Sequence, residues 1–461
     1  MRPVLTKAYE LLEAGAIALA QVESNGMRVD LGRVKKSQRK AIRKAEYLEE
    51  KIMDSYEGKV WRKKYRRKMN LLSNHQLADI LFNELKYTAT VFTDTGAPSV
   101  NVEALEEINA DFIQDYVRMK KFLKAEGTYL QGVLRENVNS YIYPFFNLHN
   151  VRTYRSSSSA PNFQNIPVRD AEIKKLVRSC FLARPGRRIV ESDFSGIEVG
   201  IAACYHKDPV MLEYISDKSK DMHRDMAMQC YMLTEKEVNK EIRYCGKNKF
   251  VFPQFYGDFY PRCARALWDA IGRLDLKTNA GVPLYEHLKA KGITKLGKCD
   301  VKEKPQAGTF EYHIKQVEDD FWGNRFKEYK KWKNRWYEQY IQNGYIDSKT
   351  GFRCSGWMKR NEVVNYPVQG AAFHCLLWSL VELQKEIQRK GMKTLLIGQI
   401  HDSIVADVPD EELGRYIRVV KRVTMKKLLQ QYSWICVPLE IEIEATPVNG
   451  SWLEKTEKFS I

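Results

Sequence analysis

The amino-acid sequence predicts an α+β fold built from discontinuous domains. The order of its segments leads to this prediction: strand-like segments gather in residues 139–210 and again in 346–461, and the mainly helical residues 211–345 separate them. A further helical region, residues 1–138, comes first. With 461 residues the chain is long enough for about three domains of roughly 150 residues each. Its hydrophobic content of 44% supports a large buried core and argues against intrinsic disorder.

The N-terminal region is predicted to be mostly helical. Residues 8–22 form an apolar-rich helix, and the turn Ser24-Asn25-Gly26 leads into a short strand at residues 27–29. A long helical pattern then runs from residue 31 to about residue 67, and another helix is expected near residues 111–126.

The charge of the chain indicates the class of its partner. Lysine and arginine number 75 against 58 acidic residues, a formal net charge of +17, so nucleic acid is the first candidate and an anionic membrane surface the second. No apolar run approaches the ~20 residues that span a bilayer, and Glu10 and Glu13 interrupt the apolar stretch that a signal peptide needs. The nine cysteines show no C-x-x-C pair and no zinc-site spacing, which is typical of reduced thiols. We therefore predict a cytoplasmic protein with no targeting segment and no membrane partner.

Two basic clusters lie in the long N-terminal helical pattern. The first, between Lys35 and Lys44, repeats at i, i+4 and fits either a solvated face or a phosphate-binding one. The second, from Lys59 to Lys68, packs seven basic residues around Trp61 and Tyr65, an arrangement that suits phosphate contact and stacking. We expect the second cluster to bind nucleic acid, through the following residues: Arg62, Lys63 and Arg66.

Two aspartates stand at the ends of predicted strands. A buried strand over residues 188–193 ends in Asp193, just before a helix over residues 196–203. Strands over residues 394–400 and 403–408 form a hairpin whose tight turn holds Asp402. Each acid alone fits an ordinary turn residue. Together, on neighbouring strand ends, they could hold paired Mg²⁺ ions roughly 4 Å apart, the arrangement used for displacement at phosphorus.

Six segments, in order, resemble the motifs of the A-family DNA polymerases. Asp193-Phe194-Ser195-Gly196-Ile197-Glu198 is similar to the D-Y-S-Q-I-E motif of that family, and His401-Asp402-Ser403 to its H-D-E motif. The helical stretch from Arg243 to Tyr256-Gly257 resembles the helix that grips the incoming nucleotide. The other similar segments are Thr153 to Ser158 with Pro161 to Pro167, Asp221-Met222-His223, and Asn365-Tyr366-Pro367-Val368-Gln369-Gly370.

The resemblance implies a right-hand polymerase fold with palm, fingers and thumb. The thumb and N-terminal helical region correspond to residues 1–138, the palm to 139–210 and 346–461, and the fingers to 211–345. The implied activity is template-directed DNA synthesis in DNA replication, in which dNTPs are added to a primer 3′-end with two Mg²⁺ ions and pyrophosphate is released. Primed template DNA and dNTPs are the implied partners.

The resemblance also implies roles for individual residues. Asp193 and Asp402 are the implied catalytic metal ligands, and Glu198 blocks the 2′ position of the sugar. The triphosphate is held by His223, Arg243 and Lys247, and the base pocket by Phe252 and Tyr256. Contacts with primer or template are implied for Arg155, Gln164, Asn165, Arg178, Asn365, Gln369 and His401.

The sequence departs from the family pattern in two places. Ser403 stands where the H-D-E motif has its glutamate, from which we expect altered metal handling with activity kept. In the nucleotide helix, Lys247 lies nine residues before Tyr256 and Lys249 seven, whereas the family spaces its lysine at eight. Pro253 adds an expected kink, and one extra residue beside a kink fits a π-bulge. We expect Lys247 to keep the triphosphate role, because it lies one turn after Arg243.

Some alternatives stay open. We find no strand ending in the D-x-E pattern that a proofreading exonuclease would have. We therefore expect that proofreading is absent, was removed, or is carried by a separate exonuclease partner. A processivity subunit is a further candidate partner. Residues 258–310 suggest an exposed insertion. This insertion fits either a solvated loop or a segment that contacts the template strand or a partner. The rival functions are a non-catalytic DNA-binding subunit and an RNA polymerase, and Glu198 argues against the latter.

Overall fold

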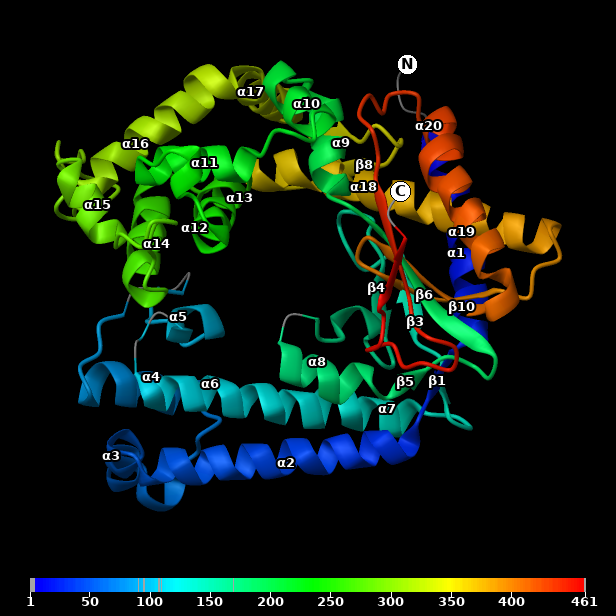
Figure 1. The fold of residues 1–461 in the computed structure, drawn as a ribbon, viewed down its shortest axis with the longest axis horizontal. Helices are drawn as coiled ribbons and strands as arrows, with labels where there is room; N and C mark the ends of the chain where they lie inside the picture. The colour runs from blue at the N-terminus through cyan, green and yellow to red at the C-terminus, as the bar shows by residue number, and fades with distance from the viewer. Residues whose placement is uncertain are drawn as a thin grey trace.

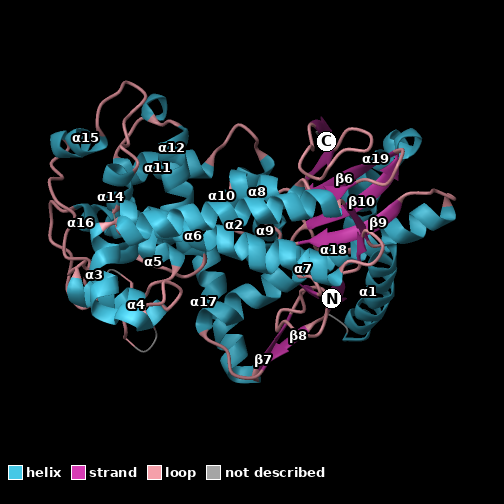
Figure 2. Cartoon of the chain, turned by 90° about the horizontal axis from the view of Figure 1, so that it is seen from below, coloured by secondary structure: helices cyan, strands magenta, loops and turns pink. Residues whose placement is uncertain are grey.

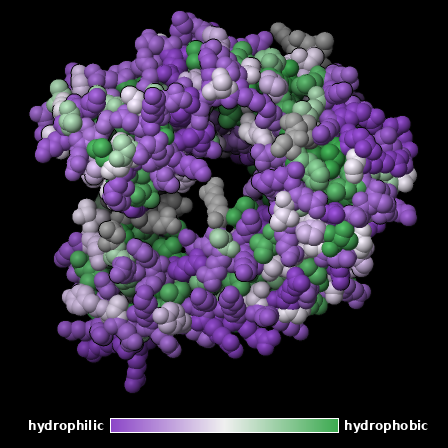
Figure 3. Space-filling model, in the orientation of Figure 1, coloured by the Kyte–Doolittle hydropathy of each residue, from purple (hydrophilic) through white to green (hydrophobic). Residues whose placement is uncertain are grey.

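The computed structural model describes residues 5–459 apart from residues 90, 94, 95, 107, 109 and 169. The chain forms a sheet-bearing body from which two mainly helical arms extend, one on each side of a central opening (Figures 1 and 3). No helix within the described residues is both long and apolar enough to cross a membrane.

A five-stranded antiparallel sheet lies in the body that joins the two arms (Figure 1). Its strand order is β12-β11-β6-β10-β9, so β6 lies at the centre between strands from far later in the chain. Strand β11 begins only at Ile441, after Pro438, which has no N–H to donate to a neighbouring strand. The strands are β6 (Arg187–Phe194), β9 (Leu395–Ile400), β10 (Ser403–Pro409), β11 (Ile441–Ala445) and β12 (Glu457–Phe459).

Helices pack on this sheet from both ends of the sequence. The long helix α18 (Arg360–Arg389) contacts α1 (Leu5–Asn25), α9 (Ile197–His206) and α17 (Lys327–Asn343). Helix α1 also packs on β9, so the first helix lies with the sheet and not with the N-terminal arm. The C-terminal helices α19 (Leu413–Arg422) and α20 (Leu428–Gln431) complete this body.

The N-terminal arm is built on two long helices, α2 (Leu31–Asp54) and α6 (Asp111–Lys124), which run side by side away from the sheet (Figures 1 and 2). The prediction of one continuous helical segment over residues 31–67 was wrong, because the first helix ends at Asp54 and Ser55 interrupts the pattern. The Ser55 Oγ accepts a hydrogen bond from the Gly58 N–H at 3.0 Å and so starts the new helix α3 (Tyr56–Tyr65). A Cβ on Gly58 would lie 1.9 Å from the Ile52 carbonyl oxygen, so only glycine fits this sharp turn.

Short elements complete the N-terminal arm and join it to the sheet-bearing body. The predicted strand β1 (Met27–Val29) is present and pairs with β2 (Tyr141–Ile142) and β5 (Phe181–Leu182). Two further antiparallel pairs lie at the edge of the body. The remaining elements are α4 (Asn74–Ala78), α5 (Val102–Glu106), α7 (Gln131–Glu136), α8 (Ala171–Arg178), β3 (Phe145–Asn147), β4 (Ser157–Ser159), β7 (Tyr345–Asp347) and β8 (Arg353–Ser355).

The second arm is helical, as predicted for residues 211–345. The expected insertion at 258–310 is not a plain loop, because it begins with α14, one face of which is buried. Its lysines at 289, 291, 295 and 298 are exposed. The helices are α10 (Pro209–Ser216), α11 (Met222–Tyr231), α12 (Lys240–Cys245), α13 (Phe252–Phe255), α14 (Tyr260–Arg273), α15 (Leu284–Ala290) and α16 (Phe310–Asp320), with a π-helical turn at Gly246–Val251.

Candidate active site

The two predicted aspartates meet at one end of the central strands. Asp193, near the end of β6, is in register with Ser403 on β10 and with Glu442 on β11. Asp402 lies in the tight turn between β9 and β10, and its carbonyl oxygen accepts a hydrogen bond from the Phe194 N–H at 3.1 Å. This bond ties the turn to the end of β6, so the neighbouring strand ends bring together two acids that lie 209 residues apart in sequence.

Negative charge gathers around Asp193. Its side chain reaches solvent, but the surrounding protein displaces water from the carboxyl group, and this desolvation is the main cause that raises its pKa to about 7. The carboxylates of Glu191, Asp402 and Glu442 add to the shift in that order. Desolvation also raises the pKa of Asp402. A bound cation would stabilise the charged form of both aspartates, so this donor set fits a hard divalent metal such as Mg²⁺.

Ser403 does not take the place of the glutamate in the family motif. It is 2% exposed, and its Oγ donates to the Ile400 carbonyl oxygen at 3.0 Å and lies 3.4 Å from a Glu191 oxygen. Within the described residues no group of three or more His, Cys, Asp or Glu side chains is arranged to hold a metal. The metal-binding candidates therefore remain the aspartate pair.

Arg155 bridges the acids at the rim of the site. Its Nη2 lies 2.7 Å from a Glu198 oxygen and 3.4 Å from an Asp402 oxygen. Glu198 lies in the first turn of α9. Desolvation raises its pKa, and the positive charge of Arg155 counteracts part of this rise. Arg155 thus contacts Glu198 and Asp402 directly in this structure, and its predicted contact with DNA stays a prediction.

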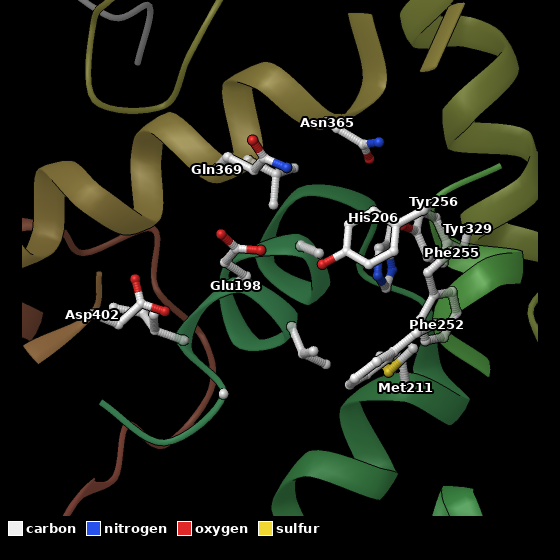
Figure 4. A pocket seen from close by; sticks show the side chains of 15 residues that line it. Glu198, His206, Met211, Phe252, Phe255, Tyr256, Tyr329, Asn365, Gln369 and Asp402 are labelled. Atoms are coloured by element: carbon white, nitrogen blue, oxygen red, sulfur yellow. The ribbon is translucent and has the colours of Figure 1, made fainter. Parts of the chain in front are cut away.

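A cavity of about 230 Å³ opens beside Asp402, which lines it, whereas Asp193 is not among its lining residues. Figure 4 shows the carboxylates of Glu198 and Asp402 on one side of it and the aromatic rings of the nucleotide helix on the other. The structure brings together six of the predicted residues here, from four separate segments of the chain: Glu198, Phe252, Tyr256, Asn365, Gln369 and Asp402. His206, Met211 and Tyr329 also line the cavity and were not predicted, because no motif marks them.

The aromatic residues of the nucleotide helix divide into two groups. Phe255 packs among Phe321, Trp322 and Phe326 in the core of the arm. Phe252 instead faces Tyr256, with ring centroids 6.5 Å apart, and Tyr256 is 53% exposed at the mouth of the cavity. This arrangement supports the choice of Phe252 and Tyr256 as the pair that meets a nucleotide.

The predicted phosphate-binding cations lie together near Phe252. The Lys247 Nζ stands 5.1 Å from the centre of the Phe252 ring, and Lys247 and Arg243 both act on His223. Burial and these two positive charges lower the pKa of His223 to about 4, so it is neutral at pH 7. Arg243 is held in place by an ion pair with Asp221.

The irregular spacing of the nucleotide helix has a structural cause. The predicted π-bulge is confirmed: residues Gly246–Val251 form a π-helical turn directly before Phe252 and Pro253. The extra residue is absorbed in this turn, and Lys247 stays beside His223. Lys249 lies near the thiol of Cys245 instead, and its charge acts on the pKa of that thiol.

Two predicted DNA contacts need correction or restriction. Arg178 is only 2% exposed: its Nε donates to the Pro167 carbonyl oxygen at 3.1 Å, and its guanidinium lies 4.0 Å from the centre of the Trp452 ring. A side chain so buried cannot reach DNA, so that prediction was wrong. Gln164 is half-buried, and its Nε2 donates to Gln399 at 2.7 Å.

The remaining predicted contacts are open to solvent. Asn165 and His401 are exposed, and His401 has a φ of +49° in the tight turn. Arg62, Lys63 and Arg66 are exposed near the tip of the N-terminal arm. The prediction that Trp61 stacks on nucleic acid was wrong. Trp61 is fully buried, and its indole N–H donates a hydrogen bond to Gln76 Oε1 at 3.0 Å.

Comparison with known proteins places this site in a family. A sequence profile described as "DNA polymerase family A" matches residues 35–269 and 314–453. The unmatched residues between these ranges overlap the insertion that the sequence suggests. The chain is 26% identical to the DNA polymerase of Bacillus phage SP01 over 93% of its length and 44% of that relative. It is 28% identical to DNA polymerase I of Aquifex aeolicus, over 94% of its own length and 65% of that protein.

The fold agrees with a solved polymerase. The polymerase domain of Pol1 from M. smegmatis, solved in complex with DNA primer-template and dNTP, matches 96% of this chain and 70% of its own with a TM-score of 0.72 and 21% identity. This match confirms the predicted α+β right-hand fold of palm, fingers and thumb. The chain spans between about two fifths and two thirds of the length of such curated relatives. With the family profile covering most of its residues, the chain belongs to DNA polymerase family A.

Proposed function

We propose that this chain is a template-directed DNA polymerase that adds dNTPs to a primer 3′-end and releases pyrophosphate. The observation that carries the proposal is the meeting of Asp193 and Asp402 at neighbouring strand ends, where Asp402 lines a cavity whose opposite wall is the nucleotide helix. Phosphoryl transfer needs charge neutralisation and alignment more than covalent help from the protein, and this site offers acids for metal and cations for phosphate. Primed template DNA and dNTPs are the proposed partners.

Each group of residues has a proposed task. Asp193 and Asp402 would hold the two Mg²⁺ ions, which when bound lower the pKa of the primer hydroxyl and neutralise charge on the triphosphate. Arg243 and Lys247 bind phosphate oxygens, since cations suit them. The neutral His223 donates a hydrogen bond there without adding charge. Glu198 occupies the space that a 2′-hydroxyl needs, and Phe252 and Tyr256 close the pocket over the base.

DNA contacts remain proposals for the exposed and half-buried residues. Asn365 and Gln369 from α18 face the cavity and are proposed to contact the primer-template (Figure 4). The other proposed contacts are Arg155, Gln164, Asn165, His401, Arg62, Lys63 and Arg66. We also propose the division into thumb (from 1–138), palm (139–210 and 346–461) and fingers (211–345). Action in DNA replication in the cytoplasm, and a separate exonuclease or processivity partner, are proposed on the same basis.

Primer extension tests the proposed function. The wild-type chain is given a primed template, Mg²⁺, and either dNTPs or rNTPs, beside Asp193→Ala, Asp402→Ala and a control, Asp410→Ala, whose exposed carboxylate pairs with Arg188 far from the cavity. We expect templated extension with dNTPs only, lost in the first two variants and kept in the control. A wild-type chain that binds primed DNA but never extends it supports a non-catalytic DNA-binding subunit instead.

A further inference from the structure

A second cavity, of about 280 Å³, lies behind the nucleotide helix. It is enclosed by the end of α13, by α17 and by the N-terminal end of α18. Phe255 and Asn365 line both this cavity and the one beside Asp402, so the two are neighbours across a shared wall. None of the sequence motifs accounts for the residues that α17 contributes to it.

Three cations line this second cavity without neutralising partners. Lys330 and Lys333 come from α17, and Arg360 is the first residue of α18. Within the described part of the chain, none of the three lies in an ion pair. Arg360 donates to the amide oxygen of Asn334, and the Lys333 Nζ stands 3.3 Å from the centre of the Trp322 ring. These contacts hold Arg360 and Lys333 in place but supply no negative charge.

The acids near the cavity do not compensate for this charge. Asp258 is a lining residue, but its Oδ1 already accepts from the Phe259 N–H at 3.0 Å and lies 3.9 Å from an Arg262 nitrogen. Glu318 on α16 acts on Lys333 only weakly, and it accepts from the Tyr260 N–H. Desolvation, then the charges of Arg360 and Lys330, lower the pKa of Lys333 to about 7.

The ligand that relieves this repulsion is an anion with several acceptor oxygens. The side-chain amides of Asn334, Asn361 and Asn365 line the same cavity and can donate to such oxygens, as they do to phosphate. The phosphate could come from a nucleic-acid strand or from a free anion such as pyrophosphate. Trp357, three residues before Arg360, is 74% exposed, and an exposed aromatic beside cations is typical of single-strand binding.

We propose that this cavity binds a phosphodiester group of the unpaired template strand, ahead of the position where the template base is copied. The proposal rests on the proposed polymerase function and adds to it a contact from α17 and Arg360. The template strand must pass the nucleotide pocket, and the shared wall puts the second cavity next to that path. Lys333 and Arg360 are here binding residues that contact DNA and take no part in the chemical step.

Binding of primed DNAs, measured by fluorescence anisotropy without nucleotide, tests this proposal. Two DNAs carry the same duplex with a template overhang of one or of eight nucleotides. The Lys333→Gln/Arg360→Gln variant is compared with Lys331→Gln, which removes an exposed lysine of α17 that pairs with Glu328. We expect roughly tenfold weaker binding of the long-overhang DNA by the double variant, with its salt slope smaller by about 0.7, the value for one phosphate of a single strand, and under about twofold change for the short one.

The pH dependence gives a second readout. A phosphate beside Lys333 raises its pKa above the value of about 7 in the free protein, so binding takes up a proton between those two values. Affinity for the long-overhang DNA is therefore expected to fall as the pH rises above about 7 and to level off below it. This dependence should be lost in Lys333→Gln, because the side chain that takes up the proton is then absent.

Three results overturn the proposal. In the first, the double variant loses affinity equally for both DNAs, and in the second it loses affinity for neither. In the third, pyrophosphate competes equally with DNAs of both overhang lengths, which assigns the cavity to a free anion. Arg360→Gln alone, at the start of α18, replaces the double variant if the latter has a lowered Tm. Binding needs no chemistry, so a chain that shows overhang-dependent binding but no primer extension refutes the proposed function and leaves this inference standing.

Discussion

Replacing Arg178 separates a structural role from a role in DNA binding. The guanidinium donates a charge-assisted hydrogen bond to the Pro167 carbonyl oxygen and lies over the Trp452 ring. The first contact contributes about 1.5–3 kcal/mol and the second about 2 kcal/mol when desolvated, and the cost of burying the cation offsets part of both. We therefore expect Arg178→Ala to lower the free energy of unfolding by about 3 kcal/mol.

The ion pair of Arg178 with Glu191 adds little to this figure. The two groups are 3.7 Å apart, and Glu191 keeps Lys455 at 2.6 Å and the Trp452 N–H at 2.9 Å after the change, so no unpaired buried charge is created. Arg178→Lys keeps the charge but loses the Nε donor, so we expect roughly half the loss.

Thermal unfolding and DNA binding, measured on the same samples, decide between the two roles. Lys175→Ala, an exposed position on the same helix α8, is the matched control and should stay within about 0.5 kcal/mol of wild type. We expect Arg178→Ala to lose several degrees in Tm while the salt dependence of primed-DNA affinity is unchanged below the transition. The reasoning is refuted if Tm is kept and the salt slope falls by about one, because that is the signature of a lost phosphate contact.

Three further predictions concern the nucleotide pocket and the N-terminal arm. Glu198→Ala should lower the preference for dNTPs over rNTPs by about tenfold or more, roughly 1.4 kcal/mol, in single-nucleotide kcat/KM; an unchanged ratio would mean that Glu198 does not meet the 2′ position. Lys247→Ala should raise the dNTP KM by about 10-fold or more and Lys249→Ala by under about twofold, whereas the reverse order places the triphosphate on Lys249. Gly58→Ala should lower Tm, because its Cβ meets a backbone carbonyl, while Gly127→Ala, with open space around it, should hold or raise Tm; equal effects contradict the clash.

The elements that could be predicted from the sequence are those whose signals are local. The strand before Asp193, the helix after it, and the hairpin with Asp402 at its tip were predicted from apolar runs ended by polar turn residues, and all three are present. The π-helical turn before Pro253 was predicted from a spacing one residue too long. In each case a few neighbouring residues decide the conformation.

The predictions that failed needed information from distant residues. Nothing near Arg178 in the sequence shows that Trp452 covers it, because that ring arrives from a loop 274 residues later. Trp61 lies among cations in the sequence and was therefore predicted to stack on nucleic acid. In the structure it is enclosed by the core of the arm and bonded to Gln76, which the neighbouring residues do not reveal. The break at Ser55 was readable in principle, since serine is one of the residues preferred at the N-cap of a helix.

The acids of the central sheet show how the chain keeps a charged site stable. Glu191 and Asp193 lie two residues apart on β6, and Glu444 and Glu442 are their partners in register on β11. Lys455 lies 2.6 Å from Glu191 and 2.8 Å from Glu444. Arg178 also pairs with Glu191 and Lys458 with Glu444, so these three cations together neutralise the inner row of acids. The outer row, with Asp193, has no such lysine in ion-pair distance among the described residues. Charge is therefore balanced where the sheet is buried and left unbalanced only at the strand end, where a cation from solution can enter.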